Sequence, residues 1–191
     1  PAEVRKQQIA DAALEIIAAR GLRHFTAREI GHALGVTDAA VFRHLPSKQA
    51  IVRAAIDRVE QLLFEGFPPA EEDPIARLGR FFRQRAGTVS RHPGVARLLF
   101  SDELARAGGQ EESDRVLAFK RKSAAFVRSC LEEARPRGLL APGVGARETT
   151  MVVMGTLMAF LFSSRRINAA EAGRDVERLW RTLENLSLIH I

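Results

Sequence analysis

The residues best suited to chemistry with a partner lie in the stretch GVTDAAVFRHLPSK, Gly35 to Lys48. Hydroxyl, carboxylate, guanidinium and imidazole groups follow one another there, with an aromatic ring among them. Such side chains hydrogen-bond base edges and phosphates, whereas no nucleophile stands paired with a base. The stretch is short, because Pro46 pushes the residue before it out of the helical region. It therefore predicts a helix of about two turns that presents polar groups to nucleic acid.

Three neighbouring helices are expected to hold this short helix in place. Apolar residues recur at helical spacing over residues 4–20, and Gly21 ends that first helix. The sequence TARE predicts a capping box, in which Thr26 caps the second helix and Glu29 reaches back. Thr37 is the expected cap of the short third helix, and Ser47 is that of a long fourth one.

Two helices joined by the glycine turn at Gly35, the second short and capped, form a helix-turn-helix. We expect Val41 and Leu45 to pack inward. The exposed start of the short helix then reads base edges, and the neighbouring positions contact the DNA backbone. The candidates for base edges are Thr37, Asp38 and Ala39. The candidates for the backbone are Thr26, Phe42, Arg43, His44 and Lys48, and Arg28 is a further candidate for a DNA contact.

The stretch FTAREIGHALGVTDAAVFRHLPSKQAIVRAAI resembles the helix-turn-helix of the TetR/AcrR family of bacterial transcriptional regulators. The matching positions are Gly21, Thr26, Ile30, Gly35, Val36, Thr37, Phe42, His44, Leu45 and Lys48. Phe42 stands where the family usually has a tyrosine that reaches a phosphate, Leu45 replaces an aromatic residue, and Gly31 replaces alanine. The resemblance implies a ligand-responsive repressor that binds a palindromic operator as a homodimer.

The rest of the chain is expected to be helical as well, which gives an all-α protein of about nine helices. FPPAEEDP, Phe67 to Pro74, interrupts the pattern most clearly. We therefore expect a DNA-binding domain over residues 1–64 and a domain for effector binding and dimerisation over residues 65–191. Further helices are predicted over residues 75–90, 94–106, 112–136, 146–166 and 172–188.

The last two predicted helices carry small and apolar residues beyond what one bundle face requires, so they are expected to form the dimer interface. The interface candidates are Val152, Gly155, Ala159, Val176, Leu179, Trp180 and Leu183. Bulky and flexible residues indicate a pocket for a small apolar effector, neutral or anionic. The pocket candidates are Phe82, Leu98, Phe100, Phe126, Met151, Met154 and Met158, with Arg97, Arg128 and Thr156 for polar contacts.

Composition excludes several classes of protein. The net charge is +6, but residues 1–66 hold nine basic and eight acidic residues, so local placement must attract DNA. The single cysteine, Cys130, excludes a disulfide framework, and we expect neither a metal nor a cofactor. No membrane-spanning run or secretory signal is visible, which favours the cytoplasm. The chain starts at Pro1 without methionine, so we expect a trimmed N-terminus.

Two alternative functions remain open at this point. One is a DNA-binding protein of the same fold that takes no small molecule and responds to a protein or to DNA alone. The other is a helical enzyme that contains a similar bundle, although no residue pattern indicates a catalytic site.

Overall fold

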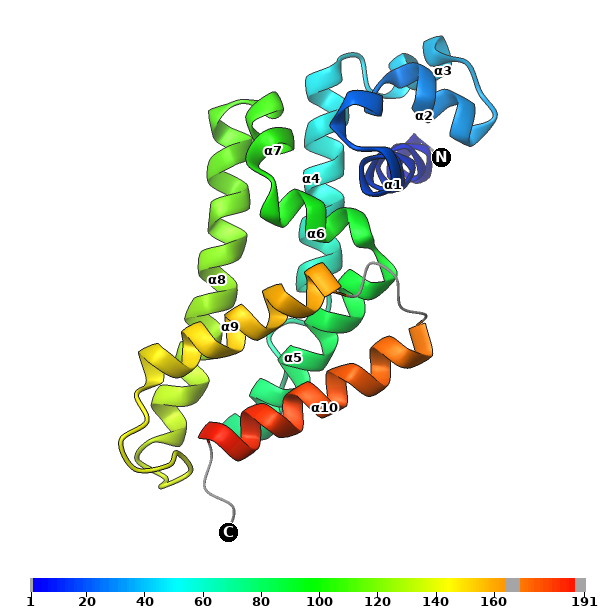
Figure 1. Ribbon diagram of the computed structural model, residues 1–191. Coiled ribbons are helices and arrows are strands. Elements are labelled where there is room, and N and C mark those ends of the chain that lie inside the picture. The colour runs from blue at the N-terminus through cyan, green and yellow to red at the C-terminus, as the bar shows by residue number, and fades with distance from the viewer. Residues whose placement is uncertain (1, 164–168, 188–191) are drawn as a thin grey trace. The chain divides into compact units, whose positions relative to one another are not determined.

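The computed structural model describes residues 2–163 and 169–187, and the elements in these ranges are helices (Figure 1). The predicted all-α class is confirmed, with ten α-helices and one 3-10 turn in place of about nine helices. They are α1 (Ala2–Arg20), η1 (Leu22–His24), α2 (Ala27–Leu34), α3 (Asp38–His44), α4 (Lys48–Phe64), α5 (Pro74–Arg91), α6 (Pro93–Phe100), α7 (Asp102–Gly108), α8 (Gln110–Ala134), α9 (Ala146–Ser163) and α10 (Ala169–Ser187).

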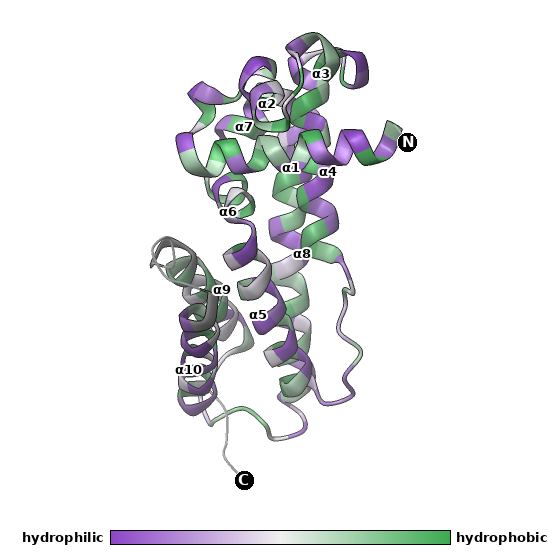
Figure 2. Cartoon of the chain, turned by 90° about the vertical axis from the view of Figure 1, so that its right-hand side faces the viewer, coloured by the Kyte–Doolittle hydropathy of each residue, from purple (hydrophilic) through white to green (hydrophobic). Residues whose placement is uncertain are grey.

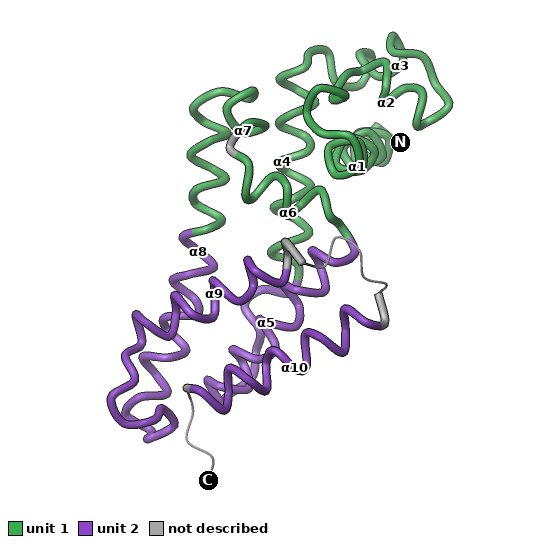
Figure 3. The backbone as a smooth tube through the Cα atoms, viewed as in Figure 1, with its two compact units in different colours: residues 1–65, 92–120 green, residues 66–91, 121–191 purple. Residues whose placement is uncertain are grey.

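The chain divides into two compact units (Figure 3). Unit 1 consists of residues 1–65 and 92–120, and unit 2 consists of residues 66–91 and 121–191. The first cut lies next to the predicted boundary after residue 64. The segment that carries α6, α7 and the first part of α8 nevertheless groups with the N-terminal helices. The division of function between the two units therefore stays a proposal.

In unit 1, α1 packs against α4 and α6, and α4 also packs against α7. The apolar faces of these helices supply fully buried side chains such as Ile17, Ile56 and Leu98. Gly94 brings α6 against the backbone of α1, because a Cβ there would lie 2.4 Å from the carbonyl oxygen of Leu14. The helices that carry the short α3 are thus part of a larger packed core than four helices alone would form.

The predicted single helix over residues 94–106 is wrong, because the structure breaks it into α6 and α7 at Ser101. Ser101 is extended, with φ −114° and ψ 114°, and its hydroxyl accepts a hydrogen bond from the amide of Glu103 at 3.4 Å. A serine that caps a new helix competes with continuation of the old one. The end of the predicted 146–166 helix lies partly outside the described residues.

The turn between α2 and α3 depends on two glycines. Gly35 has φ 66° and ψ 30°, the left-handed conformation that glycine adopts at little cost. Gly31 lies under the turn, since a Cβ there would be 2.8 Å from the carbonyl oxygen of Val36. The amide of Val36 donates to the carbonyl of Gly31 at 2.9 Å. The alanine usual in the resembling family would therefore have to push this turn outward.

All three predicted N-caps of the helix-turn-helix are present, at Thr26, Thr37 and Ser47, and each accepts a hydrogen bond from the amide three residues later. The prediction that the carboxylate of Glu29 reaches back to the amide of Thr26 is wrong. The amide of Thr26 donates instead to the carbonyl of His24 at 2.9 Å, and the carboxylate of Glu29 pairs with Arg20. The 3-10 turn η1 thus satisfies the donor that Glu29 was expected to reach.

In unit 2, α5 packs against α9 and α10, which also contact each other. Gly79 on α5 lies against the indole of Trp180, where a Cβ would be 2.8 Å from Cε2. Phe82 also packs on that indole, with ring centroids 5.7 Å apart. Figure 2 shows α10 as largely hydrophilic. Its buried side chains include Val176, Trp180 and Leu183, and Trp180 contacts α5. Among the described residues, no helix is both long and apolar enough to span a bilayer.

Candidate nucleic-acid interface

The nine residues predicted to contact DNA all lie on or beside α2, α3 and the start of α4, within unit 1. Eight of them are exposed, and His44 is half-buried. Residues behind them are buried, since Val41 is fully covered and Leu45 nearly so. The short helix therefore has one face in the core and one face in solvent, as a helix that enters a groove requires.

The exposed start of α3 carries groups that can read bases. The hydroxyl of Thr37 accepts from the amide of Ala40 at 3.2 Å, which leaves its own hydrogen to donate. One carboxylate oxygen of Asp38 accepts from the amide of Ala39 at 2.8 Å, and the other can accept from a cytosine amino group. Phe42 follows four residues after Asp38, on the same face, and its side chain is 42% exposed.

Several basic residues of the N-terminal helices differ in whether a carboxylate pairs with them. Arg20, Arg53 and Arg58 pair with carboxylates of unit 1 and so hold its helices together. In contrast, no carboxylate of the described chain lies within ion-pair distance of Arg28, Arg43 and Lys48. Arg28 lies on α2, Arg43 on α3 and Lys48 on the first turn of α4, and all three are exposed. Residues 1–66 are nearly neutral in sum, but these three cations are not offset by neighbouring carboxylates. They are therefore the groups that could neutralise phosphates.

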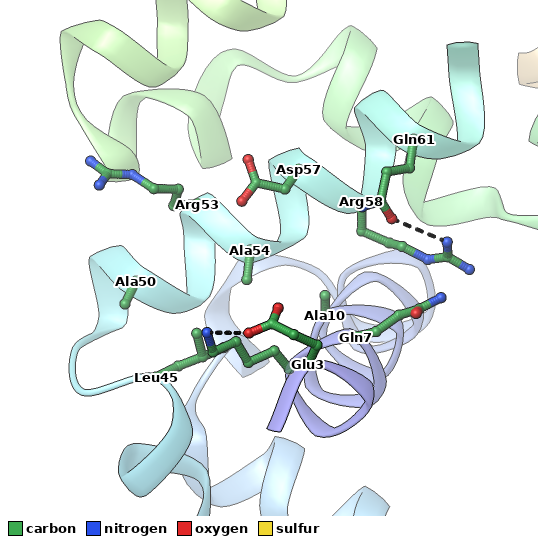
Figure 4. Close-up of a pocket in the computed structure, with 11 residues that line it drawn as sticks. Glu3, Gln7, Ala10, Leu45, Ala50, Arg53, Ala54, Asp57, Arg58 and Gln61 are labelled. Carbon is green, nitrogen blue, oxygen red and sulfur yellow. Dashed lines mark hydrogen bonds and ion pairs between the residues drawn. The ribbon is translucent and has the colours of Figure 1, made fainter. Parts of the chain in front are cut away.

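A groove of about 380 Å³ runs between α1 and α4 (Figure 4). Glu3 and Gln7 extend into it from α1, and Asp57 and Gln61 from α4. The groove is polar and its charges are already engaged, since Lys6 pairs with Glu3 at 2.8 Å. None of the nine candidate DNA contacts lines it. The groove is therefore separate from the candidate DNA surface.

A buried carboxylate joins α4 to α8 behind the helix-turn-helix. Glu112 is only 1% exposed and accepts from Nε of Arg53 at 2.8 Å and from Nη1 of Arg115 at 3.1 Å. Arg115 also donates to Asp57 and Glu60 of α4, at 2.7 and 2.8 Å. This network orients α4, whose first turn carries Lys48 and whose cap follows α3 directly.

The predicted effector-pocket residues are divided between the two units. Leu98 and Phe100 belong to unit 1, while Phe82 and Phe126 belong to unit 2. On α9, Met154 is half-buried, but Met151 and Met158 are exposed at 69% and 43%. The polar candidates also lie elsewhere: Arg97 is beside Gly21 in unit 1, Arg128 pairs with Glu132, and Thr156 donates to the carbonyl of Val152.

The predicted dimer residues on α9 and those on α10 differ in their exposure. On α9, Val152, Gly155 and Ala159 are exposed in the single chain and form one stripe with Met151 and Met158. On α10, Val176, Trp180 and Leu183 are buried within unit 2, because the apolar face of α10 is occupied by α5. Leu179 is half-buried. Only the α9 part of the predicted surface is free to meet a partner.

Sequence reasoning missed one charged residue of the unit 2 interior, Arg85. It lies on the stripe formed by Leu78, Phe81, Phe82 and Val89 of α5, and it is 8% exposed. An arginine at an apolar-face position of an amphipathic helix was the signal that could have found it. Within the described residues, no three His, Cys, Asp or Glu side chains are grouped so as to hold a metal ion.

The sequence profile of the family described as "Bacterial regulatory proteins, tetR family" matches residues 9–55, which include the whole helix-turn-helix. The N-terminal region of this chain is a helix-turn-helix domain of the TetR family. The match and the capped α3 lie on the same residues. The chain that carries this domain is thus a DNA-binding transcriptional regulator.

Known proteins resemble this regulator over most of its length. The nucleoid occlusion factor SlmA of Marinobacter nauticus is 28% identical over 169 residues, which cover 84% of this chain and 85% of that protein. The ketosteroid transcriptional regulator KstR2 of Mycobacterium tuberculosis has the same fold, with a TM-score of 0.78, 16% identity and coverage of 97% and 96%. AibR, solved with isovaleryl coenzyme A and operator DNA, has a TM-score of 0.72, 20% identity and coverage of 92% and 98%.

Proposed function

We propose that this regulator is a repressor that binds a two-fold symmetric operator as a homodimer and releases it when a small apolar effector binds unit 2. The observation that carries the DNA-binding part is the exposed, capped start of α3. The same three helices carry the exposed residues Arg28, Arg43 and Lys48, for which the described chain offers no ion-pair partner. Fixed helix caps and a packed rear face present this surface without further ordering, which lowers the entropic cost of binding. We propose no catalytic role.

We propose that Thr37, Asp38 and Ala39 face base edges in the major groove, because they begin the exposed face of α3. The phosphate contacts would come from the residues that surround this start. They are Thr26, Arg28, Phe42, Arg43, His44 and Lys48. Phe42 has no hydroxyl, so its contribution would be ring contact with the sugar. Contacts with phosphates and sugars position the protein on the DNA and carry little sequence information.

The homodimer is supported by the apolar stripe on α9. Met151, Val152 and Met158 are large apolar side chains left exposed on one face, with Gly155 and Ala159 between them. Small residues between large ones let a second helix approach closely, and a contiguous exposed apolar face is typical of an interaction site. A two-fold axis through α9 would give two reading helices, which a palindromic operator requires.

The test is selection of bound sequences from random DNA, followed by binding measurements on the recovered site. We expect a palindrome whose half-sites are about one helical turn apart or a multiple of that. Thr37→Ala and Arg43→Ala should both bind it more weakly. Recovery of no preferred sequence, or of single half-sites bound by a monomer, would contradict the proposal.

A second candidate is a DNA-binding protein of the same fold that needs no effector. It is favoured by the relative with 28% identity over 84% of this chain, which is named a nucleoid occlusion factor. Mapping bound sites on the chromosome separates the two. A few sites at promoters support the repressor, whereas many sites spread along the chromosome support the second candidate.

A further inference from the structure

The helices α2 and α3 carry two carboxylates, Glu29 on α2 and Asp38 on α3. Asp38 is a proposed base contact. Glu29 lies in the first turn of α2, directly after Arg28, and its amide donates to the hydroxyl of Thr26 at 3.2 Å. Its side chain is 34% exposed. A negative charge therefore lies next to two proposed phosphate contacts, where it would repel DNA unless a cation neutralised it.

The cation that neutralises Glu29 is Arg20, the last residue of α1. Nη1 of Arg20 donates to Oε2 of Glu29, so the pair bridges the η1 turn between α1 and α2. The side chain of Arg20 is 51% exposed, and an ion pair this exposed contributes little to folding stability. Buried residues such as Ile9 and Ile17 fix α1 independently. Stability of the fold alone therefore does not account for Arg20.

Arg20 also engages fewer of its nitrogens than the other two paired arginines of the N-terminal helices. Arg53 uses Nε and Nη2 for two carboxylates of α8. Arg58 uses Nε for Asp11 and Nη1 for Gln61. Arg20 uses Nη1 alone, and its Nε and Nη2 have no partner among the described residues. The exposed guanidinium therefore keeps one edge of N–H groups for an outside acceptor.

The free edge of Arg20 has the geometry that binds two oxygens at once. Arg83 uses the same edge on α5, where Nε and Nη2 donate to the two carboxylate oxygens of Glu177 at 2.6 and 3.1 Å. A phosphate presents a similar pair of oxygens, and arginine binds it through two parallel hydrogen bonds. The pair with Glu29 thus leaves Arg20 able to bind a phosphate in this way.

We infer that Arg20 is a further DNA contact, whose Nε and Nη2 donate to a backbone phosphate beside the start of α2 while Glu29 holds the guanidinium in place. The inference rests on the proposed contacts of Thr26 and Arg28, because it adds a third group at the same end of α2. The ion pair restricts the long side chain before DNA arrives, so less side-chain entropy is lost on binding. Such a contact positions the protein and does not depend on the base sequence.

The test measures binding of the full chain to a DNA duplex of mixed sequence at several salt concentrations. Arg20→Ala should weaken binding and reduce the salt dependence of the binding constant by a slope of about one for each bound protomer, because one phosphate contact is lost. Arg83→Ala is the matched control, since it removes the same charge from an exposed ion pair in unit 2, and it should leave the slope unchanged. An unchanged slope in Arg20→Ala would overturn the inference.

A double variant that combines Arg20→Ala with Glu29→Gln separates a phosphate contact from mere neutralisation of Glu29. If Arg20 contacts a phosphate, the double variant keeps the reduced slope, because the donor is still missing. If Arg20 only neutralises Glu29, the double variant regains the slope and the affinity of the wild type, and the inference is wrong. Circular dichroism checks the fold of each variant, and Arg20→Gln replaces Arg20→Ala if that variant does not fold.

Selection of bound sequences with the wild type and with Arg20→Ala separates this inference from the proposed function. If both recover the same palindrome and bind it with the same salt slope, the repressor stands and the Arg20 contact is refuted. If the wild type recovers no palindrome while Arg20→Ala still has a reduced slope on mixed DNA, the contact stands and the symmetric operator is refuted.

Discussion

Nε of Arg53 donates to Oε1 of Glu112 at 2.8 Å, and this bond links the middle of α4 to the first turn of α8. The two partners differ in environment, since the carboxylate is 1% exposed and the guanidinium side chain is 59% exposed. Burying the carboxylate without partners would cost free energy. Hydrogen bonds from Arg53 and Arg115 offset that cost. The position of α4, and with it that of α3, depends on this carboxylate.

Glu112→Ala should lower the free energy of unfolding by roughly 1.5–3 kcal/mol, the range for hydrogen bonds to charged groups. The loss should fall below that of a fully buried pair, because the two arginines can be rehydrated. Urea denaturation measures it. Glu111→Ala is the matched control, since Glu111 is exposed and 3.6 Å from Arg53, and it should change stability by at most about 0.5 kcal/mol. Equal effects of the two substitutions would show that burial of Glu112 has no special role.

Lys48→Ala should weaken binding to all DNA sequences and reduce the salt dependence of the binding constant by a slope of about one, because one phosphate contact is lost. Titrations at several salt concentrations measure the slope. Arg128→Ala, in unit 2, should leave the slope unchanged. A changed sequence preference with the original slope would mean that Lys48 contacts bases instead of phosphates.

Asp38→Ala should relax the sequence preference at one base pair of each half-site, by about 1–3 kcal/mol of discrimination. The reason is that the free carboxylate oxygen of Asp38 can accept from a cytosine amino group. Binding to non-cognate DNA should become slightly tighter, since a negative charge near phosphates is removed. The measurement compares wild type and variant on operators altered one base pair at a time. Uniform weakening on all of them would contradict a base-reading role.

Gly155→Arg should convert the proposed homodimer to monomers without unfolding the chain. A Cβ at Gly155 meets no atom within 4 Å in the single chain, so a side chain there disturbs only a partner. Sedimentation at micromolar concentration measures the oligomeric state, and circular dichroism checks the fold. Ala118→Arg, on an exposed position of α8 in unit 1, is the control and should remain dimeric. A dimeric Gly155→Arg protein would exclude α9 as the interface.

The pair between Arg83 and Glu177 should make stability depend on pH at the acidic end. The hydrogen bonds from Arg83 lower the pKa of Glu177 below its ordinary value of 4.5. A carboxyl with a lowered pKa in the folded state stabilises above its ordinary pKa, and this contribution is lost as pH falls through the folded value. Thermal unfolding should therefore show a smaller difference between wild type and Glu177→Gln at pH 3 than at pH 7. The effect should be small and screened by salt, because the pair is largely exposed.

The sequence by itself determined the helix-turn-helix. The caps at Thr26, Thr37 and Ser47 bond amides three residues away, and the turn at Gly35 depends on the φ of one residue. These interactions are local, so residue type and spacing define them before any tertiary contact forms. The inward packing of Val41 followed from helical spacing in the same way.

Tertiary structure decided which faces were free and which charges were paired. The apolar residues of α10 predicted a dimer surface, but α5 covers Trp180. The residues of α10 alone do not indicate that α5 is their partner. The pairing of Arg53 with Glu112 and the contact of Arg85 with Ser123 join residues 59 and 38 positions apart. Periodicity reports which side of a helix is apolar, whereas the partner of that side depends on how distant segments pack. Which basic residues are held in ion pairs is likewise a property of the folded chain, as the pairs of Arg20, Arg53 and Arg58 show.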